Sequence, residues 1–285
     1  MNSNTLAQNT IAKSGHTSGD KFARQSFLGI DSQSKLENCT VGIVGAGGGG
    51  SHIVQQLAHL GFRRYVIYDH DVVEDTNLNR VVGANEGDVR AGRLKIEIAR
   101  RAIKGLSRKS EISAHPQRWQ DNPAPLRGCD IVFGCVDTFK ERHELEACCR
   151  RYLIPYIDIG MDVHQAEGEP PVMAGQVILS LPNDPCLFCL GFLTEKRLAQ
   201  EAALYGATGG RPQVVWPNGI LASTAIGIAV NLLTDWSRSQ HRFVYLQYDG
   251  ASGTVMPHAR VPYLQNAICR HYPTDQVGEP RASKL

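Results

Sequence analysis

Residues 41–51 read VGIVGAGGGGS, a short apolar run that leads into four consecutive glycines. β-Branched residues in such a run predict a buried strand. Glycine loses more backbone entropy on ordering than any other residue, so a glycine run after a strand indicates that a ligand approaches the backbone closely. Gly45, Gly47 and Gly50 also match the G-x-G-x-x-G spacing, in which a phosphate rests on backbone N–H groups at the start of a helix.

Strand and helix patterns alternate on both sides of this stretch, up to residue 160. The strand patterns lie at 40–47, 64–71, 129–137 and 154–160, and the helical patterns lie at 50–62, 92–106 and 138–153. Repeated strand–helix–strand units predict an α/β fold, a Rossmann-like doubly wound and mostly parallel sheet with helices on both faces. Ligands bind at the carboxyl ends of such strands, where the glycines, Asp69 and Asp137 fall.

The pattern changes after residue 160 and predicts a C-terminal antiparallel extension. A hairpin-forming strand at 174–180 leads into a cysteine-containing turn, and a β-hairpin with a central DGASG is expected within 243–261. Helices are expected from residue 194 and at 219–236. The second of these is interrupted by Ser, Thr and Asn, which favours a buried or amphipathic helix over a membrane span.

Composition excludes some functions. The 285-residue chain has a net charge of +2, without the basic field of a general nucleic-acid binder. Residues 1–20 are polar and turn-rich, lack the apolar stretch of a signal peptide, and predict a disordered tail. Eight cysteines without a secretory signal favour a reducing compartment, so we expect a cytoplasmic protein. The final tripeptide SKL matches a peroxisomal address, which stays open.

The segment after the second strand distinguishes two nucleotide ligands. Asp69, nineteen residues after Gly50, is placed to bind ribose hydroxyls, as in NAD-dependent oxidoreductases. Asn77, Arg80 and Lys95 then follow, a cluster of donors that a nicotinamide cofactor does not need. Arg80 and Lys95 can neutralise the β- and γ-phosphates of ATP and the charge that leaves on pyrophosphate. Asp137 is placed to hold a Mg²⁺ that bridges phosphate oxygens.

Several ordered motifs, KFARQSFLGID, GAGGGGS, DHDVVEDTNLNR, GRLK and DTFKER, carry a family resemblance. Together they resemble the ThiF/MoeB/HesA family, bacterial relatives of ubiquitin-activating enzymes, over about residues 20–255. The resemblance implies that residues 21–285 form one adenylation domain. Its nucleotide-binding half would be about 21–160, and its partner-binding and possible zinc half about 161–285.

The family's site residues map onto this chain motif by motif. The resemblance implies a homodimer in which Arg24 reaches the partner's active site, with Arg142 bracing the helix after Asp137. Arg24, Arg80, Lys95 and Asp137 would be catalytic, with Asp137 on magnesium. The residues implied to bind ATP are Gly45, Gly47, Gly48, Asp69, Asp71, Asn77, Arg80 and Lys95. From the residues alone, Asp71 can equally be a solvated loop residue.

Cysteine spacing points to half of a metal site. Cys186 and Cys189 have the two-residue gap that lets both thiolates reach one tetrahedral ion. The resemblance implies a structural zinc completed by a second CxxC pair near the C-terminus, but this chain offers only Cys269 and His271. We therefore expect these four residues to bind Zn²⁺, or else Cys269 to pack and His271 to be solvated.

The resemblance implies an activity and leaves its substrate open. The carboxylate of a C-terminal glycine, on a ubiquitin-like or sulfur-carrier protein, would attack the α-phosphate of ATP and release pyrophosphate. Many relatives then form a thioester, but residues 190–268 lack cysteine. Either the protein stops at the adenylate, or a cysteine such as Cys189 substitutes. The alternatives are a peptide or tRNA-linked carboxylate, a catalytically silent scaffold, and an NAD-dependent oxidoreductase.

Overall fold

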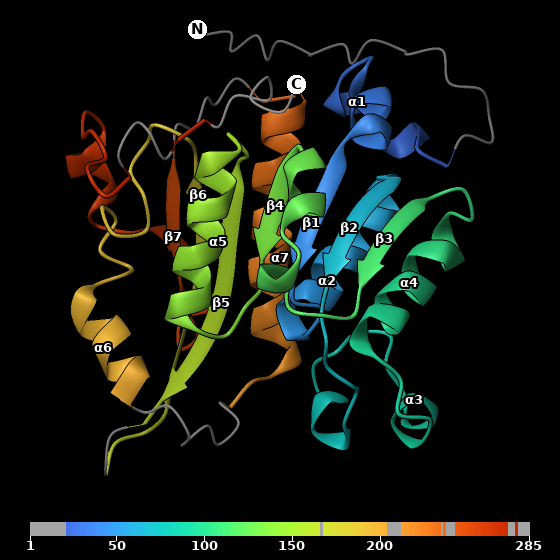
Figure 1. Ribbon diagram of the computed structural model, residues 1–285, viewed down its shortest axis with the longest axis horizontal. Coiled ribbons are helices and arrows are strands. Elements are labelled where there is room, and N and C mark those ends of the chain that lie inside the picture. The colour runs from blue at the N-terminus through green and yellow to red at the C-terminus, as the bar shows by residue number, and fades with distance from the viewer. Residues whose placement is uncertain are drawn as a thin grey trace, which may run out of the picture.

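One sheet runs through the computed structural model in the order β3-β2-β1-β4-β5-β6-β7-β8 (Figure 1). The structure describes residues 21–165, 168–203, 212–234, 236–237, 243–272 and 277–278. The strands are β1 Thr40–Val44, β2 Arg64–Tyr68, β3 Glu111–His115, β4 Ile131–Gly134, β5 Tyr156–His164, β6 Val172–Ser180, β7 Val244–Asp249 and β8 Thr254–Pro257. The expected tail at 1–20 and the SKL tripeptide lie outside the described residues.

The sheet has a parallel half and an antiparallel half. Strands β3, β2, β1, β4 and β5 pair in parallel, whereas β5–β6, β6–β7 and β7–β8 are antiparallel. Right-handed crossover helices are required between parallel strands, which is why this half carries the strand–helix alternation. The predicted fold class and the C-terminal antiparallel extension are confirmed.

Helices cover both faces of the sheet (Figure 1). The α-helices are α1 Ser32–Asn38, α2 Gly48–Leu60, α3 Glu86–Arg90, α4 Lys95–Leu106, α5 Phe139–Arg151, α6 Glu195–Ala203 and α7 Val215–Leu233. The short 3₁₀ turns are η1 Ala23–Leu28, η2 Asp75–Asn77, η3 Trp119–Asp121, η4 Ala124–Gly128 and η5 Val261–Leu264. Figure 1 shows α7 and α2 behind the sheet and α5 in front of it.

Two hydrophobic clusters follow from the two-residue period of the strands. Val41 and Ile43 of β1 point into the cluster that buries α2, α4 and α7. Val44 points the other way, into the cluster that contains Leu145 and Cys149 of α5. Burial on both faces explains why the inner parallel strands β1, β2 and β4 read as nearly continuous apolar runs.

Helix α7 is long and apolar enough to cross a membrane by length and composition alone. Half of its most apolar window is buried, and Leu221, Ala222 and Ala225 lie in the main core cluster. These contacts are those of a core helix in this fold.

Strand β3 has no clear signal in the sequence and was not predicted. Its sequence, EISAH, is short and half polar, because β3 lies at the edge of the sheet and none of its residues is fully buried. An edge strand that buries so little has no distinctive hydrophobic pattern.

Candidate active site

The glycine loop joins β1 to α2 and needs its glycines for steric reasons. Gly45 has a φ of 92°, and a Cβ there would lie 2.4 Å from the Cys135 carbonyl oxygen. A Cβ on Gly50 would lie 1.8 Å from the carbonyl oxygen of Gly45. Nothing lies within 4 Å of a Cβ built on Gly47, the residue before α2, so the backbone is open there, whereas a Cβ on Gly48 would lie 2.7 Å from Nδ2 of Asn218. Exposed backbone N–H groups at a helix start bind phosphate.

A cavity of about 290 Å³ lies in front of this loop, at the carboxyl ends of the parallel strands. Every site residue that the sequence predicts, apart from Arg24 and the Cys/His set, lines it. These residues are Gly45, Gly47, Gly48, Asp69, Asp71, Asn77, Arg80, Lys95 and Asp137. The cavity therefore brings together the phosphate loop and the charges that the sequence places in four separate segments.

Asp69 is buried at the end of β2 and has a structural role beside any ligand role. Its Oδ2 accepts the N–H of Ala46 in the glycine loop at 2.6 Å, and its Oδ1 accepts the N–H of Asp71 at 2.8 Å. Burial raises the pKa of Asp69, which the nearby Lys95 charge and these two N–H groups partly offset. Asp69 thus fixes the shape of the loop while lining the cavity.

Lys95 begins α4 and points back into the cavity. Its Nζ lies 2.7 Å from Oδ2 of Asp71, and its N–H donates to the Asp71 carbonyl oxygen at 2.9 Å. Burial alone would raise the pKa of Asp71, but the Lys95 ammonium outweighs it and lowers that pKa. The ammonium is therefore held in place by a carboxylate at the cavity wall.

Arg80 and Asn77 come from the turn that follows β2. Asn77 is buried and its Oδ1 accepts the N–H of Glu74 at 3.2 Å, which closes the turn η2. Arg80 is half-buried, and its Nη1 donates to the Thr76 carbonyl oxygen and to Oδ1 of Asn79. Its partners are neutral groups of its own loop, so its charge is available to an anion in the cavity.

Some cavity residues escaped the sequence analysis. They are Gln117 and Arg118 after β3, Glu141 on α5, and Gln213, Asn218 and Leu221 at the start of α7. Burial raises the pKa of Glu141, against the lowering effect of Arg118. Recognising β3 would have placed Arg118 at the carboxyl edge of the sheet, but the α7 residues have no local signal because only the tertiary fold brings them here.

A second cavity of about 410 Å³ adjoins the first. It lies over β5, β6 and β7 and is walled by α5 and by Arg197, Gln200 and Glu201 of α6. Asp137, Arg142, Gly160 and Met161 line both cavities. A ligand in the second cavity can therefore reach one in the first, and we call this second cavity the side groove.

Arg24 lies apart from both cavities. It is exposed on η1 and, in the described part of the chain, it lines neither cavity. Within one chain, Arg24 does not join the site that the other predicted residues form.

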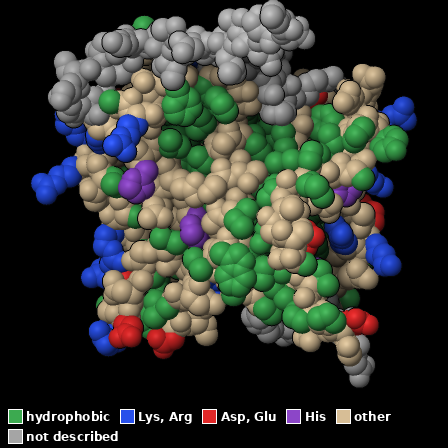
Figure 2. Space-filling model, turned by 180° about the vertical axis from the view of Figure 1, so that it is seen from behind, with side chains coloured by type: hydrophobic (Ala, Val, Ile, Leu, Met, Phe, Trp, Pro, Cys, Tyr) green, Lys and Arg blue, Asp and Glu red, His purple; other side chains and the backbone are tan. Residues whose placement is uncertain are grey.

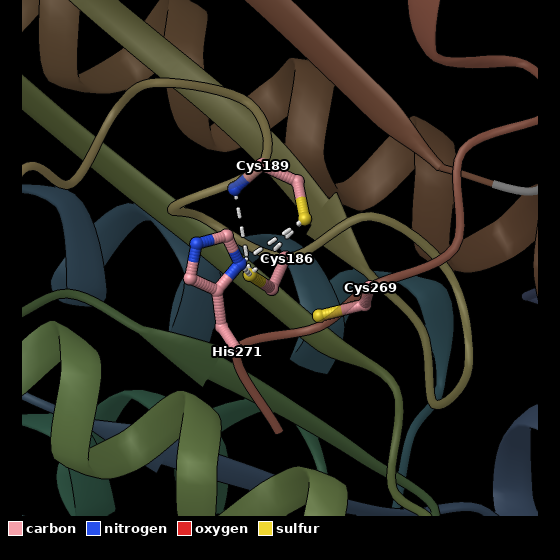
Figure 3. Close-up of side chains that lie close together, drawn as sticks. All are labelled: Cys186, Cys189, Cys269 and His271. Carbon is pink, nitrogen blue, oxygen red and sulfur yellow. Dashed lines mark hydrogen bonds between the residues drawn. The ribbon is translucent and has the colours of Figure 1, made fainter. Parts of the chain in front are cut away.

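Cys186, Cys189, Cys269 and His271 come together in a compact cluster (Figure 3). Their ligand atoms all lie within 4.8 Å of one another, and Nδ1 of His271 lies 3.4 Å from both Cys186 Sγ and Cys189 Sγ. A tetrahedral ion with Zn–S bonds of about 2.3 Å separates its ligand atoms by a little under 4 Å. The donor atoms and their spacing fit Zn²⁺.

Glu146 of α5 forms hydrogen bonds to both chain segments that carry this cluster. The carboxylate is fully buried and accepts the N–H of Leu187, between the two cysteines, at 3.0 Å. It also accepts the hydroxyl of Tyr272, next to His271, at 3.0 Å, and lies 3.4 Å from Arg150 Nε. One buried carboxylate thus connects both segments of the cluster to α5.

All eight cysteines lie in the described part of the chain, and none forms a disulfide. Burial raises the pKa of the Cys135 thiol, and burial likewise raises the pKa of Cys148 to about 11. Thiols with such raised pKa values are poor nucleophiles.

The model of the ThiF family matches residues 21–271. This chain belongs to the ThiF family. The resemblance inferred from the motifs is therefore confirmed, and the described site lies within the ThiF region.

Curated ThiF relatives include activating enzymes. The chain is 29% identical over 259 residues to the SAMP-activating enzyme E1 of Haloferax volcanii, covering 88% of this chain and 87% of that protein. It is 32% identical over 176 residues to the adenylyltransferase and sulfurtransferase MOCS3 of Drosophila yakuba, covering 60% of this chain and 36% of that one. The match thus spans about a third of the MOCS3 length.

Solved structures show the same ThiF fold. E. coli MccB with ATP has a TM-score of 0.68 at 20% identity, covering 86% of this chain and 73% of that one. MccB with MccA has the same TM-score of 0.68, covering 85% and 72%.

Proposed function

We propose that this protein is an ATP-dependent adenylyltransferase that activates the C-terminal glycine carboxylate of a ubiquitin-like or sulfur-carrier protein. The observation that carries the proposal is the shared wall of the two cavities. One cavity holds an open glycine loop with Lys95, Arg80 and Asp137, and the other is a groove that leads to it. The match to the SAMP-activating enzyme over most of both chains supports this choice of substrate class.

The reaction needs alignment and charge stabilisation more than proton transfer. In this proposal the phosphates of ATP lie on the open N–H groups of the glycine loop, and Asp69 accepts from the ribose. A terminal carboxylate is already ionised at neutral pH, so it needs no general base. Its oxygen bonds to the α-phosphorus while the bond to the bridging oxygen breaks, and Lys95 and Arg80 stabilise the charge on the departing pyrophosphate.

Asp137 fits a magnesium role by its chemistry and position. It is an exposed carboxylate on the wall of the cavity, and Mg²⁺ is usually held by one or two carboxylates together with substrate phosphates. Bound there, the ion would neutralise phosphate charge. Asp71 has a different role in this proposal, since its carboxylate holds the Lys95 ammonium.

We propose further that the protein stops at the adenylate. Its sequence from 190 to 268 has no cysteine, and Cys189 lies in the Cys/His cluster with its sulfur 3.6 Å from that of Cys186. The activated acyl group would then pass directly to an external thiol or amine.

ATP–pyrophosphate exchange tests the proposed function. Purified protein with ATP and Mg²⁺ is assayed with and without small ubiquitin-like proteins that end in Gly-Gly. Exchange that depends on one such carrier supports the proposal. Exchange with a C-terminal peptide alone would shift the substrate class to peptides, and tight ATP binding without any exchange would favour a silent scaffold.

We also propose that the Cys/His cluster binds one structural Zn²⁺. The test is the zinc content of the purified protein, measured by elemental analysis. We expect about one ion per chain, and its loss in the variants Cys186→Ser and Cys269→Ser. Cys148→Ser is the matched control, because Cys148 is outside the cluster and should leave the zinc content unchanged.

A homodimer is the third part of the proposal. Figure 2 shows hydrophobic side chains gathered on the face that carries α7. Val215, Trp216 and Leu232 of α7 are exposed apolar residues. Phe27 of η1 and Trp236 are also exposed, and their rings meet edge to face with centroids 6.2 Å apart. Large apolar side chains that are exposed together on one face are typical of an interface between subunits. Phe27 lies near Arg24 in η1, so such an interface would carry Arg24 toward a second copy.

Mixing two inactive variants tests this arrangement. Arg24→Ala and Lys95→Ala would each lose exchange activity alone. If Arg24 serves the partner's site, a mixed dimer regains one intact site, so an equal mixture should recover about a quarter of wild-type activity after subunit exchange. No recovery from a demonstrably mixed dimer would refute a role for Arg24 in the partner's site.

A further inference from the structure

The two cavities meet at Arg142, which was expected only to brace α5. Arg142 is buried, with 7% of its surface exposed, yet it lines both cavities together with Asp137, Gly160 and Met161. A buried guanidinium at the junction of a nucleotide cavity and a groove is costly unless its charge is used or compensated. Its hydrogen bonds show which part of the group is compensated.

One amino group of Arg142 is fully engaged. Nη1 lies 2.5 Å from both carboxylate oxygens of Asp158 and donates to the Ile159 carbonyl oxygen at 3.0 Å. Asp158 is completely buried and also accepts the Tyr156 hydroxyl at 2.9 Å and Nε2 of Gln176 at 3.3 Å. This network fixes the orientation of the guanidinium.

The other amino group of Arg142 lies beside Gly160, which lines both cavities. Among the described residues, the structure gives Nη2 no hydrogen-bond partner, although the side chain is more than nine-tenths buried. A Cβ built on Gly160 would lie 2.5 Å from Nη2 of Arg142 and 2.7 Å from Nε2 of Gln176. Gly160 and Gln176 are register partners on β5 and β6, so both face the same side of the sheet.

Two donor nitrogens therefore lie close together beside Gly160, and glycine is the residue that lets both approach the backbone this closely. One donor is charged and the other is an amide with a second hydrogen to give. A pair of neighbouring donors, one of them a guanidinium, matches a carboxylate. Gly160 lines both cavities, so the pair lies where the side groove meets the nucleotide cavity.

We propose that Nη2 of Arg142 and Nε2 of Gln176, beside Gly160, form the binding site for the attacking carboxylate of the acyl substrate. This inference rests on the proposed adenylation. One carboxylate oxygen accepts from the two donors, and the other faces the nucleotide. That second oxygen forms the bond to the α-phosphorus, the bond from phosphorus to the bridging oxygen breaks, its electron pair leaves on pyrophosphate, and no proton moves.

The site also accounts for selectivity toward an ionised terminus. A carboxamide lacks the negative charge that the Arg142 guanidinium favours. In one of its two orientations it would also place its own NH₂ donor against the donors of Arg142 and Gln176. Hydrogen bonds to charged groups are stronger than neutral ones, so the acid should bind more tightly than the amide by at least about tenfold.

Calorimetry with paired peptides tests this site. The probes are two synthetic seven-residue peptides ending in Gly-Gly, one a free acid and one a carboxamide, titrated in the presence of a non-hydrolysable ATP analogue. The variants are Gln176→Met, which removes one donor, and Gly160→Ala, whose methyl group would push both donors aside. Both avoid Arg142 itself, because its removal would leave Asp158 buried and unpaired. Gln247→Met is the matched control, since Gln247 lies opposite Gln176 on β7 and lines the same groove.

We expect the wild type and Gln247→Met to prefer the acid at least tenfold. Gln176→Met and Gly160→Ala should each reduce that preference at least threefold, with the affinity for the ATP analogue unchanged. A preference that survives in both variants overturns the inference, and so does a wild type that binds acid and amide equally or binds neither. Carrier-dependent exchange in the wild type would leave the proposed function standing in any of these cases.

Discussion

The parallel and antiparallel halves of the sheet handle charge in different ways. In the parallel half, the cavity charges stand on loops at strand ends and at the start of α4, and they pair at the cavity wall, as Lys95 does with Asp71. Toward the antiparallel half, where α5 contacts Ser180 of β6, the charges of α5 are buried in networks, as Glu146 is with Arg150. Charges at the cavity wall can reach a ligand, whereas buried networks hold the fold and its Cys/His cluster.

The buried network should give the largest effect. Glu146→Leu leaves Arg150 buried without its carboxylate and releases Leu187 and Tyr272, so we expect the free energy of unfolding to fall by about 3–5 kcal/mol. Urea unfolding measures it. Glu144→Leu, on the same helix with a half-exposed side chain, should cost no more than about 1 kcal/mol. If both variants lost the same free energy of unfolding, the buried network around Glu146 would have no special role in stability.

Lys95→Ala should show the opposite behaviour. Removing the ammonium takes away charge stabilisation of the departing pyrophosphate, so carrier-dependent exchange should fall about 10²–10³-fold. The free energy of unfolding should change by less than about 1 kcal/mol, because the pair with Asp71 is partly exposed. Lys104→Ala, on the same helix α4, should keep wild-type exchange. A Lys95→Ala protein with wild-type exchange activity would contradict the proposal that the charges of the parallel half act on the phosphates of ATP.

Asp88 gives a smaller, pH-dependent effect in the parallel half. A bidentate hydrogen bond from Arg101, at 2.6 and 2.7 Å, lowers the pKa of Asp88. A lowered folded-state pKa contributes stability above the unfolded value of about 3.9 and loses it as pH falls through the folded value.

Asp88→Asn should therefore lower the free energy of unfolding by about 1–2 kcal/mol at pH 7, with a difference that disappears as pH falls through the lowered folded-state pKa of Asp88. Urea unfolding at pH 7 and at a series of acidic pH values checks this. A difference that stays constant with pH would mean that Asp88 acts through shape and not through charge.

The parallel half could be predicted because its signals are local. Glycines after a strand, Asp69 at the next strand end, and Lys95 at a helix start each occupy a position that strand–helix alternation defines. The cavity around them follows from one rule about the carboxyl ends of parallel strands. Cys186 and Cys189 were also visible, because their spacing suits one ion.

The rest depends on contacts that no local pattern encodes. Gly160 and Gln176 meet only through the register of β5 and β6, and Arg142 joins them from α5. Glu146 looks like an ordinary charge on a helix until the fold brings Leu187 and Tyr272 to it. In the described part of the chain Arg24 lines neither cavity, so the role proposed for it requires a second copy.

The most direct measurement is the fate of carrier and ATP in one reaction. Protein, ATP, Mg²⁺ and small ubiquitin-like proteins ending in Gly-Gly are incubated together, the carriers are weighed by intact-mass spectrometry, and the nucleotides are separated by chromatography. We expect a carrier heavier by one adenylyl group, with pyrophosphate released and no ADP. Release of ADP, or carriers that all stay unmodified while ATP is bound, would contradict this expectation.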